Sequence, residues 1–80
     1  MRKEEISNKI FQIVRKIVTN EETINLKYDD DIRYMLDSIQ FVTLIVEIES
    51  TFNVEVRDED FEIEKLGSIE KITELILSYM

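Results

Sequence analysis

The amino-acid sequence predicts an all-α fold, a small bundle of three main helices plus one short helix, with a long first loop. One glycine and no proline in 80 residues leave few positions at which a helix must break. Apolar residues recur mostly at helical spacing rather than in alternation. A chain of 9.6 kDa can bury one modest core, so we expect a single domain over residues 1–80.

The first helix is expected over roughly residues 3–19. Its apolar residues form a face about 160° wide on a helical wheel. They are Ile6, Ile10, Phe11, Ile13, Val14, Ile17 and Val18. Glu4 and Glu5 fall at the positive end of the helix dipole. Arg15 and Lys16 fall near the negative end, so the charges at both ends stabilise this helix.

A long loop is expected between residues 20 and 37, where the helical period is lost. Loops of this length are uncommon in compact domains unless they are functional or disordered. We expect an ordered crossover held to the core, because aliphatic residues recur along it: Ile24, Leu26, Ile32, Met35 and Leu36.

The second half of the chain holds the other helices. The second helix is expected from about Ser38 to Phe52, where Asn53 can adopt the left-handed conformation that ends a helix. An extended link and a short helix over residues 58–64 follow, and this short helix contributes Phe61 and a further candidate, Ile63, to the core. The last helix begins at Ser68, and its apolar face comprises Ile69, Ile72, Leu75, Ile76 and Tyr79.

The second helix is apolar around more than half of its circumference. One face is an adequate core face by itself and comprises Phe41, Leu44, Ile45, Ile48 and Phe52. A second apolar stripe lies about 130° from the centre of the first face on the helical wheel. It comprises Ile39, Val42 and Val46. Either the long loop or a partner protein covers this stripe, and the spacing leaves both interpretations open.

An aspartate and a serine begin the second helix. If Asp37 is the N-cap, its carboxylate accepts from the first free amides and Gln40 returns the bond, as in a capping box. The Ser38 hydroxyl is then free in the first turn, where an attached anion such as a phosphodiester would face the positive end of the helix. The dipeptide alone favours the simpler interpretation, in which Ser38 is an unmodified cap or turn residue.

Composition excludes several classes of function. Cysteine and histidine are absent, which removes the usual zinc ligands, thiolate nucleophiles and imidazole-based triads, so we expect no catalytic residue and no enzymatic activity. The run Asp29–Asp31 is followed by Arg33 and Tyr34, where an EF-hand needs an oxygen ligand and a glycine, so we expect no metal site there.

The charge and hydropathy patterns indicate the kind of partner. Eighteen acidic and ten basic residues give a net charge of −8, which would repel nucleic acid and anionic lipid and favours a basic protein surface. No apolar run is long enough to span a bilayer, and the first residues lack the pattern of a signal peptide. We therefore expect a monomeric, cytoplasmic protein without membrane insertion.

Three features together resemble the acyl and peptidyl carrier proteins over essentially the whole chain. They are the sequence Leu36-Asp37-Ser38-Ile39, the doubly apolar helix that ends at Phe52, and the aliphatic and acidic stretch over residues 54–61. The resemblance implies a single carrier domain with the acyl-carrier-protein-like bundle. It also implies that Ser38, beside the acidic Asp37, carries 4′-phosphopantetheine transferred from coenzyme A by a separate phosphopantetheinyl transferase.

The same resemblance implies how such a chain works. Acyl or aminoacyl groups would be held as thioesters, and the second apolar stripe (Ile39, Val42 and Val46) with Glu47 would bind the partner enzymes. These partners would be the transferase and the acyl- or aminoacyl-loading enzymes and synthases, with basic docking surfaces.

The cargo stays open among fatty acyl, polyketide, nonribosomal peptide and D-alanyl pathways. Leu36 precedes Asp-Ser, and Gln40 and Thr43 are uncharged, whereas carriers of fatty acid synthesis commonly have glycine or alanine and acids there. Leu-Asp-Ser is similar to free-standing peptidyl and D-alanyl carriers. The alternative function is a non-covalent helical protein-interaction module without a prosthetic group, in which Ser38 is an unmodified cap.

Overall fold

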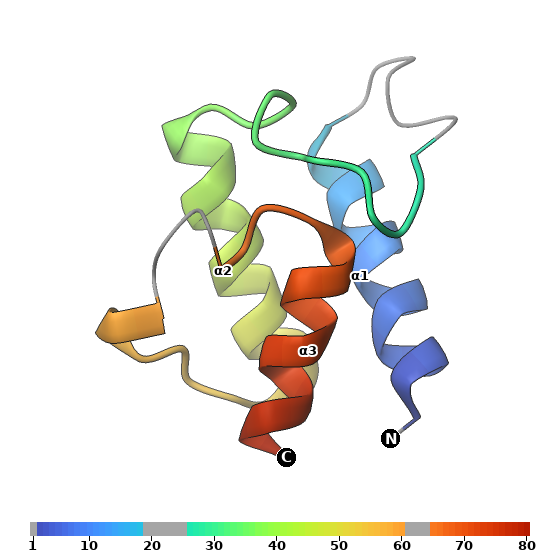
Figure 1. Ribbon diagram of the computed structural model, residues 1–80. Coiled ribbons are helices and arrows are strands. Elements are labelled where there is room, and N and C mark those ends of the chain that lie inside the picture. The colour runs from blue at the N-terminus through green and yellow to red at the C-terminus, as the bar shows by residue number, and fades with distance from the viewer. Residues whose placement is uncertain (1, 19–25, 61–64) are drawn as a thin grey trace.

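The computed structural model describes residues 2–18, 26–60 and 65–80 (Figure 1). Within these ranges the chain forms α1 (Lys3–Ile17), α2 (Ser38–Phe52), the 3-10 helix η2 (Asp58–Asp60) and α3 (Ile69–Tyr79). The predicted all-α bundle is confirmed. Only the start of the expected short helix is described, and Ile24, Phe61 and Ile63 lie outside the described residues.

The core lies between α1 and the two helices that pack against it, α2 and α3 (Figure 1). Each helix contributes the apolar face that its sequence spacing predicts. The fully enclosed side chains include Ile6, Ile10, Val14, Leu44, Ile45, Ile48, Ile69, Ile72 and Ile76. Burying one such side chain stabilises the fold by about 1.5–3 kcal/mol, so this shared core determines how the three helices pack together.

The first helix is shorter than its apolar pattern suggests. Its last residue is Ile17, because the backbone of Val18 is already extended, with φ −105° and ψ 96°. The Val18 side chain is nevertheless buried, and its amide still donates to the carbonyl of Val14. The expected end at residue 19 is therefore wrong, since the apolar pattern continues past the last helical residue to a side chain that enters the core from extended backbone.

The described part of the long loop is held to the start of α3. The amide of Ile32 donates to the carbonyl of Gly67 at 2.8 Å, and the amide of Glu70 donates to the carbonyl of Tyr28 at 2.9 Å. The side chains of Leu26 and Ile32 are buried in the core. The ordered crossover is thus confirmed for residues 26–37, and it fixes where the chain enters α2.

The end of α2 and the start of α3 carry the predicted caps. Asn53 is left-handed, with φ 54° and ψ 47°, and ends α2. Ser68 precedes α3 and its hydroxyl accepts from the amide of Lys71 at 3.1 Å. In the part of the chain that the structure describes, no helix is long and apolar enough to cross a membrane.

A polar cluster joins η2 to the last turn of α3. The Tyr79 hydroxyl donates to the Asp60 carboxylate at 2.6 Å and accepts from the amide of Arg57 at 3.1 Å. Lys65 pairs with the same carboxylate at 3.0 Å. The Tyr79 hydrogen bond and then Lys65 lower the pKa of Asp60, while burial and the Asp60 carboxylate raise the pKa of Tyr79.

Candidate functional site

The start of α2 is fixed by a complete capping box. The Asp37 carboxylate accepts from the Gln40 amide at 2.8 Å, and the Asp37 amide donates to the Gln40 side-chain oxygen at 3.1 Å. Both bonds satisfy amides that would otherwise lack a partner at the helix end. The uncharged residue at position 40 therefore has a local structural role.

Ser38 is the first residue of α2, and its side chain is exposed. Among the described residues, the Ser38 hydroxyl has no hydrogen-bond partner, because Asp37 and not Ser38 caps the helix. The hydroxyl lies at the positive end of the helix dipole, where a negatively charged group is stabilised. A phosphate ester on this oxygen would gain from that field without displacing any bond of the fold.

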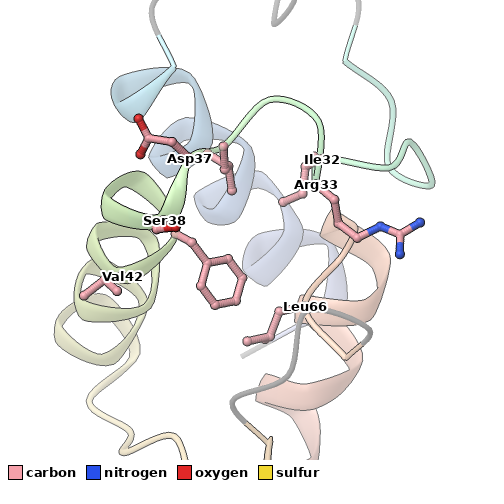
Figure 2. A pocket seen from close by; sticks show the side chains of 8 residues that line it. Ile32, Arg33, Asp37, Ser38, Val42 and Leu66 are labelled. Carbon is pink, nitrogen blue, oxygen red and sulfur yellow. The ribbon is translucent and has the colours of Figure 1, made fainter.

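A pocket of about 380 Å³ lies beside this serine. Its lining is largely apolar and comprises Ile32, Arg33, Leu36, Asp37, Ser38, Phe41, Val42 and Leu66. Figure 2 shows Ser38 and Val42 on α2 across from Leu66, with Ile32 at the upper edge. In Figure 2 the carboxylate of Asp37 points away from Leu66, and Arg33 is the other charged residue of the lining.

The second apolar stripe is open to solvent. Ile39 is 78% exposed, Val42 51% and Val46 57%, so the long loop does not cover them. The first interpretation of the sequence, that the loop packs on this stripe, is therefore wrong. The loop instead packs its own aliphatic residues into the core beside α3. An exposed row of aliphatic side chains on one helix is a surface suited to a partner.

Glu47 borders the second apolar stripe and pairs with a base from α1. The Lys16 ammonium lies 3.5 Å from its carboxylate, and both side chains are partly exposed. Such surface pairs contribute little to stability, but this one neutralises the acid locally. The structure thus places Asp37 at the N-cap of α2 and Ser38 and the second apolar stripe on that helix. Glu47 lies on the same helix and is paired with Lys16.

Sequence reasoning missed the features of the pocket lining and of the preceding turn that lie outside α2. Leu66 forms the far wall of the pocket, and its position follows from packing that no local pattern shows. Tyr34 is 89% exposed in the turn before the helix, where apolar periodicity gives no signal. Arg33 pairs with Asp31 through its side chain, and this guanidinium lowers the pKa of Asp31 to about 2.

The described residues contain no group of three acidic side chains arranged to hold a metal ion. Asp31 is engaged by Arg33 and also forms an isolated backbone bridge with Ser68. The Asp30 carboxylate accepts from the amide of Lys27 at 2.9 Å. Two of the three loop aspartates thus stabilise the turn geometry of the crossover.

Comparison with known proteins is consistent with this geometry. The family model described as the phosphopantetheine attachment site matches residues 8–76, which is most of the chain. The chain is also similar to the acyl carrier protein of Chlorobium phaeovibrioides (strain DSM 265 / 1930), at 35% identity over 80 residues, covering 96% of this chain and 97% of that protein.

A second bacterial relative gives the same result. The acyl carrier protein of Lactobacillus johnsonii (strain CNCM I-12250 / La1 / NCC 533) is 35% identical over 82 residues, covering 99% of this chain and 98% of its own length. The family match begins within α1 and ends within α3, and the relatives cover nearly the whole chain. The chain therefore belongs to the acyl carrier protein family, the phosphopantetheine-binding carriers, and its cofactor is covalently attached 4′-phosphopantetheine.

Proposed function

We propose that Ser38 is the attachment residue for 4′-phosphopantetheine and that the chain carries acyl or aminoacyl groups as thioesters between enzymes. The observation that carries this assignment is the exposed hydroxyl of Ser38 at the capped start of α2, which has no hydrogen-bond partner among the residues that the structure describes. A serine that was merely a helix cap would use its oxygen to accept from the helix, as Ser68 does. At α2 that role is taken by Asp37.

The chain's own residues position the attached group. The capping box of Asp37 and Gln40 holds the first turn of α2 rigid, so the ester oxygen has a defined place. The positive end of the helix faces the phosphodiester charge. The cofactor supplies a terminal thiol for thioester chemistry. The pocket between Val42 and Leu66 gives apolar material attached near Ser38 a surface to contact.

In the proposed function the reactions themselves belong to other proteins. The partners are a phosphopantetheinyl transferase and the enzymes that load and process the cargo, and the chain is not an enzyme but a monomeric, cytoplasmic carrier. The net charge of −8 supports steering toward enzymes with basic surfaces. The second apolar stripe, exposed beside Ser38, is the contact surface that we assign to these enzymes together with Glu47.

The cargo class is an acyl or aminoacyl group. The relatives named acyl carrier protein support an acyl cargo. Fatty acid and polyketide synthesis are the pathways that we propose for such a cargo. An aminoacyl cargo, in nonribosomal peptide or D-alanyl transfer, is the second candidate. It is favoured by the uncharged first half of α2, where Gln40 is used for capping and the Thr43 hydroxyl donates to the carbonyl of Ile39 at 2.9 Å.

The assignment of Ser38 is tested by incubating the purified chain with coenzyme A and a broad-specificity phosphopantetheinyl transferase. Intact mass should increase by one phosphopantetheine. Ser38→Ala should abolish the increase, whereas Ser50→Ala, which removes another exposed serine of α2, should leave it unchanged. An unchanged mass of the wild type with several transferases would instead support a non-covalent interaction module.

A further inference from the structure

The pocket beside Ser38 is closed on the side of the core and open along α2. Ile32 and Leu66 belong to the core and are almost fully enclosed, although both line the pocket. On α2, Phe41 is half-buried and Val42 is 51% exposed. A group attached to Ser38 can therefore enter the pocket from the solvent side and rest on side chains of the core.

The two charged residues of the pocket lining are committed to other partners. The Asp37 carboxylate accepts from the Gln40 amide at 2.8 Å, and the Arg33 guanidinium pairs with Asp31. In Figure 2 the Arg33 guanidinium is directed away from Ser38. The remaining lining is apolar apart from the serine itself. The pocket thus fits an apolar group that is joined to the serine oxygen through a polar one.

Both sides of the pocket are held by hydrogen bonds of the backbone. The Ile32 amide donates to the carbonyl of Gly67, next to Leu66, at 2.8 Å. The Met35 amide donates to the Ile32 carbonyl at 3.0 Å. The opposite side is the first turn of α2, which its capping box fixes. The spacing across the pocket is therefore set before anything binds, so little ordering of the protein opposes binding.

The groups of 4′-phosphopantetheine follow a fixed order from the attachment oxygen. The phosphodiester comes first, and a methylene and a carbon that carries two methyl groups come next. A hydroxyl and two amides follow, and the thiol that holds the cargo is at the far end. With the phosphate on Ser38, the dimethyl carbon is the first apolar branch that can reach the pocket. Because the arm is covalently attached, even a weak apolar contact is populated.

We propose that Phe41, Val42 and Leu66 bind the dimethyl carbon at the base of the phosphopantetheine arm and leave the cargo in solvent. This inference rests on the proposed function of Ser38. The amides of the arm stay outside the pocket, because burying an amide without a hydrogen-bond partner is unfavourable. The pocket then limits the directions in which the arm leaves α2, while the thioester end stays accessible to enzymes.

The test compares the apo, holo and octanoyl forms of the whole chain. A broad-specificity transferase attaches the arm from coenzyme A or octanoyl-coenzyme A, and intact mass checks that modification is complete. Val42→Ala shortens a side chain of the pocket. Val46→Ala is the matched control, because Val46 lies on the same helix, is 57% exposed and is not part of the lining. Melting temperatures and the nuclear Overhauser contacts of the two arm methyl groups are measured.

The wild type and Val46→Ala should each melt about 4–8 °C higher in the holo form than in the apo form, because burial of the methyl groups stabilises the fold. Val42→Ala should lose about half of this gain or more. The arm adds the same charge to every variant, so the difference between the two variants reports the pocket contact alone. In the wild type the arm methyl groups should contact Phe41 and Leu66, and the octanoyl group should add no further gain.

Equal gains in Val42→Ala and Val46→Ala would overturn the inference, and so would arm methyl groups that contact neither Phe41 nor Leu66. A further rise in melting temperature with the octanoyl group, or contacts of its chain with Leu66, would mean that the pocket holds the cargo instead. A wild-type chain that never gains the mass of the arm would overturn the proposed function of Ser38, and this inference with it.

Discussion

Asp37 and Gln40 exchange two hydrogen bonds, one from the Gln40 amide to the Asp37 carboxylate at 2.8 Å and one from the Asp37 amide to the Gln40 side chain at 3.1 Å. This reciprocal pair determines that α2 begins at Ser38. Within the described ranges it also leaves the serine hydroxyl without a hydrogen-bond partner, because the capping role is already filled. The geometry of the attachment residue thus depends on its two neighbours.

Replacing Asp37 tests that dependence. Asp37→Ala should lower the free energy of unfolding by about 0.5–2 kcal/mol, the usual cost of losing an N-cap side chain. Asp37→Asn should retain most of the stability, because an asparagine oxygen caps a helix about as well. Urea denaturation of the three proteins measures the difference. Equal losses in the two variants would show that the carboxylate charge, rather than the capping bond, stabilises this helix end.

The two apolar faces of α2 should respond differently to substitution. Val42→Asp and Val46→Asp should change stability by no more than about 0.5 kcal/mol, because both side chains are more than half exposed. Leu44→Ala or Ile48→Ala, in the core, should cost about 2–5 kcal/mol. Thermal melting and the rate of modification are measured for all four. Unfolding by either aspartate would mean that the second apolar stripe is buried in solution.

The hydrogen bond between Tyr79 and Asp60 should make stability depend on pH at both extremes. The pKa of Asp60 is lowered, chiefly by this bond, so its stabilising effect is present above the ordinary carboxyl pKa of 3.8 and is lost as pH falls through the lowered value. The pKa of Tyr79 is raised, so its contribution is present below pH 10 and is lost as pH rises through the raised value.

Tyr79→Phe removes the hydroxyl and keeps the ring, over which the Arg57 guanidinium lies at 5.3 Å. The stability gap between wild type and variant should therefore be widest near neutral pH and should narrow in acid and in strong base. Denaturant midpoints from pH 2 to 11 provide the measurement. A gap that is constant across this range would show that the hydroxyl contributes only packing.

Salt should stabilise the fold. Eighteen acids against ten bases repel one another in the compact state, and added ions screen this repulsion over a Debye length of about 8 Å at physiological ionic strength. The melting temperature should rise from low to moderate sodium chloride. A melting temperature that stays flat or falls would mean that ion pairs such as Lys3 with Glu74, at 2.8 Å, outweigh the repulsion.

The helices could be predicted from sequence because each has a one-sided apolar pattern or a recognisable cap. Asn53 ends α2 and Ser68 caps the start of α3, as the chemistry of the two side chains suggests. The exact end of α1 could not be predicted, since Val18 is buried whether or not its backbone is helical. Apolar spacing reports where a side chain lies and not the conformation that brings it there.

The candidate site could be predicted only along α2. Asp37, Ser38 and the second apolar stripe are close in sequence, so one helix places them together. Leu66 reaches the same pocket from a distant part of the chain, through the bond between the Ile32 amide and the Gly67 carbonyl that holds the loop to the start of α3. Local sequence carries no trace of that pairing, which depends on tertiary packing.

The central claim is that Ser38 carries the cofactor, and the most direct measurement is its localisation in protein isolated from the native host. Trypsin should release residues 34–57 as one peptide, because the chain has no lysine or arginine between Arg33 and Arg57. Tandem mass spectrometry of this peptide should place phosphopantetheine on Ser38. A peptide that is unmodified in every preparation, or modified at Ser50, would contradict the account.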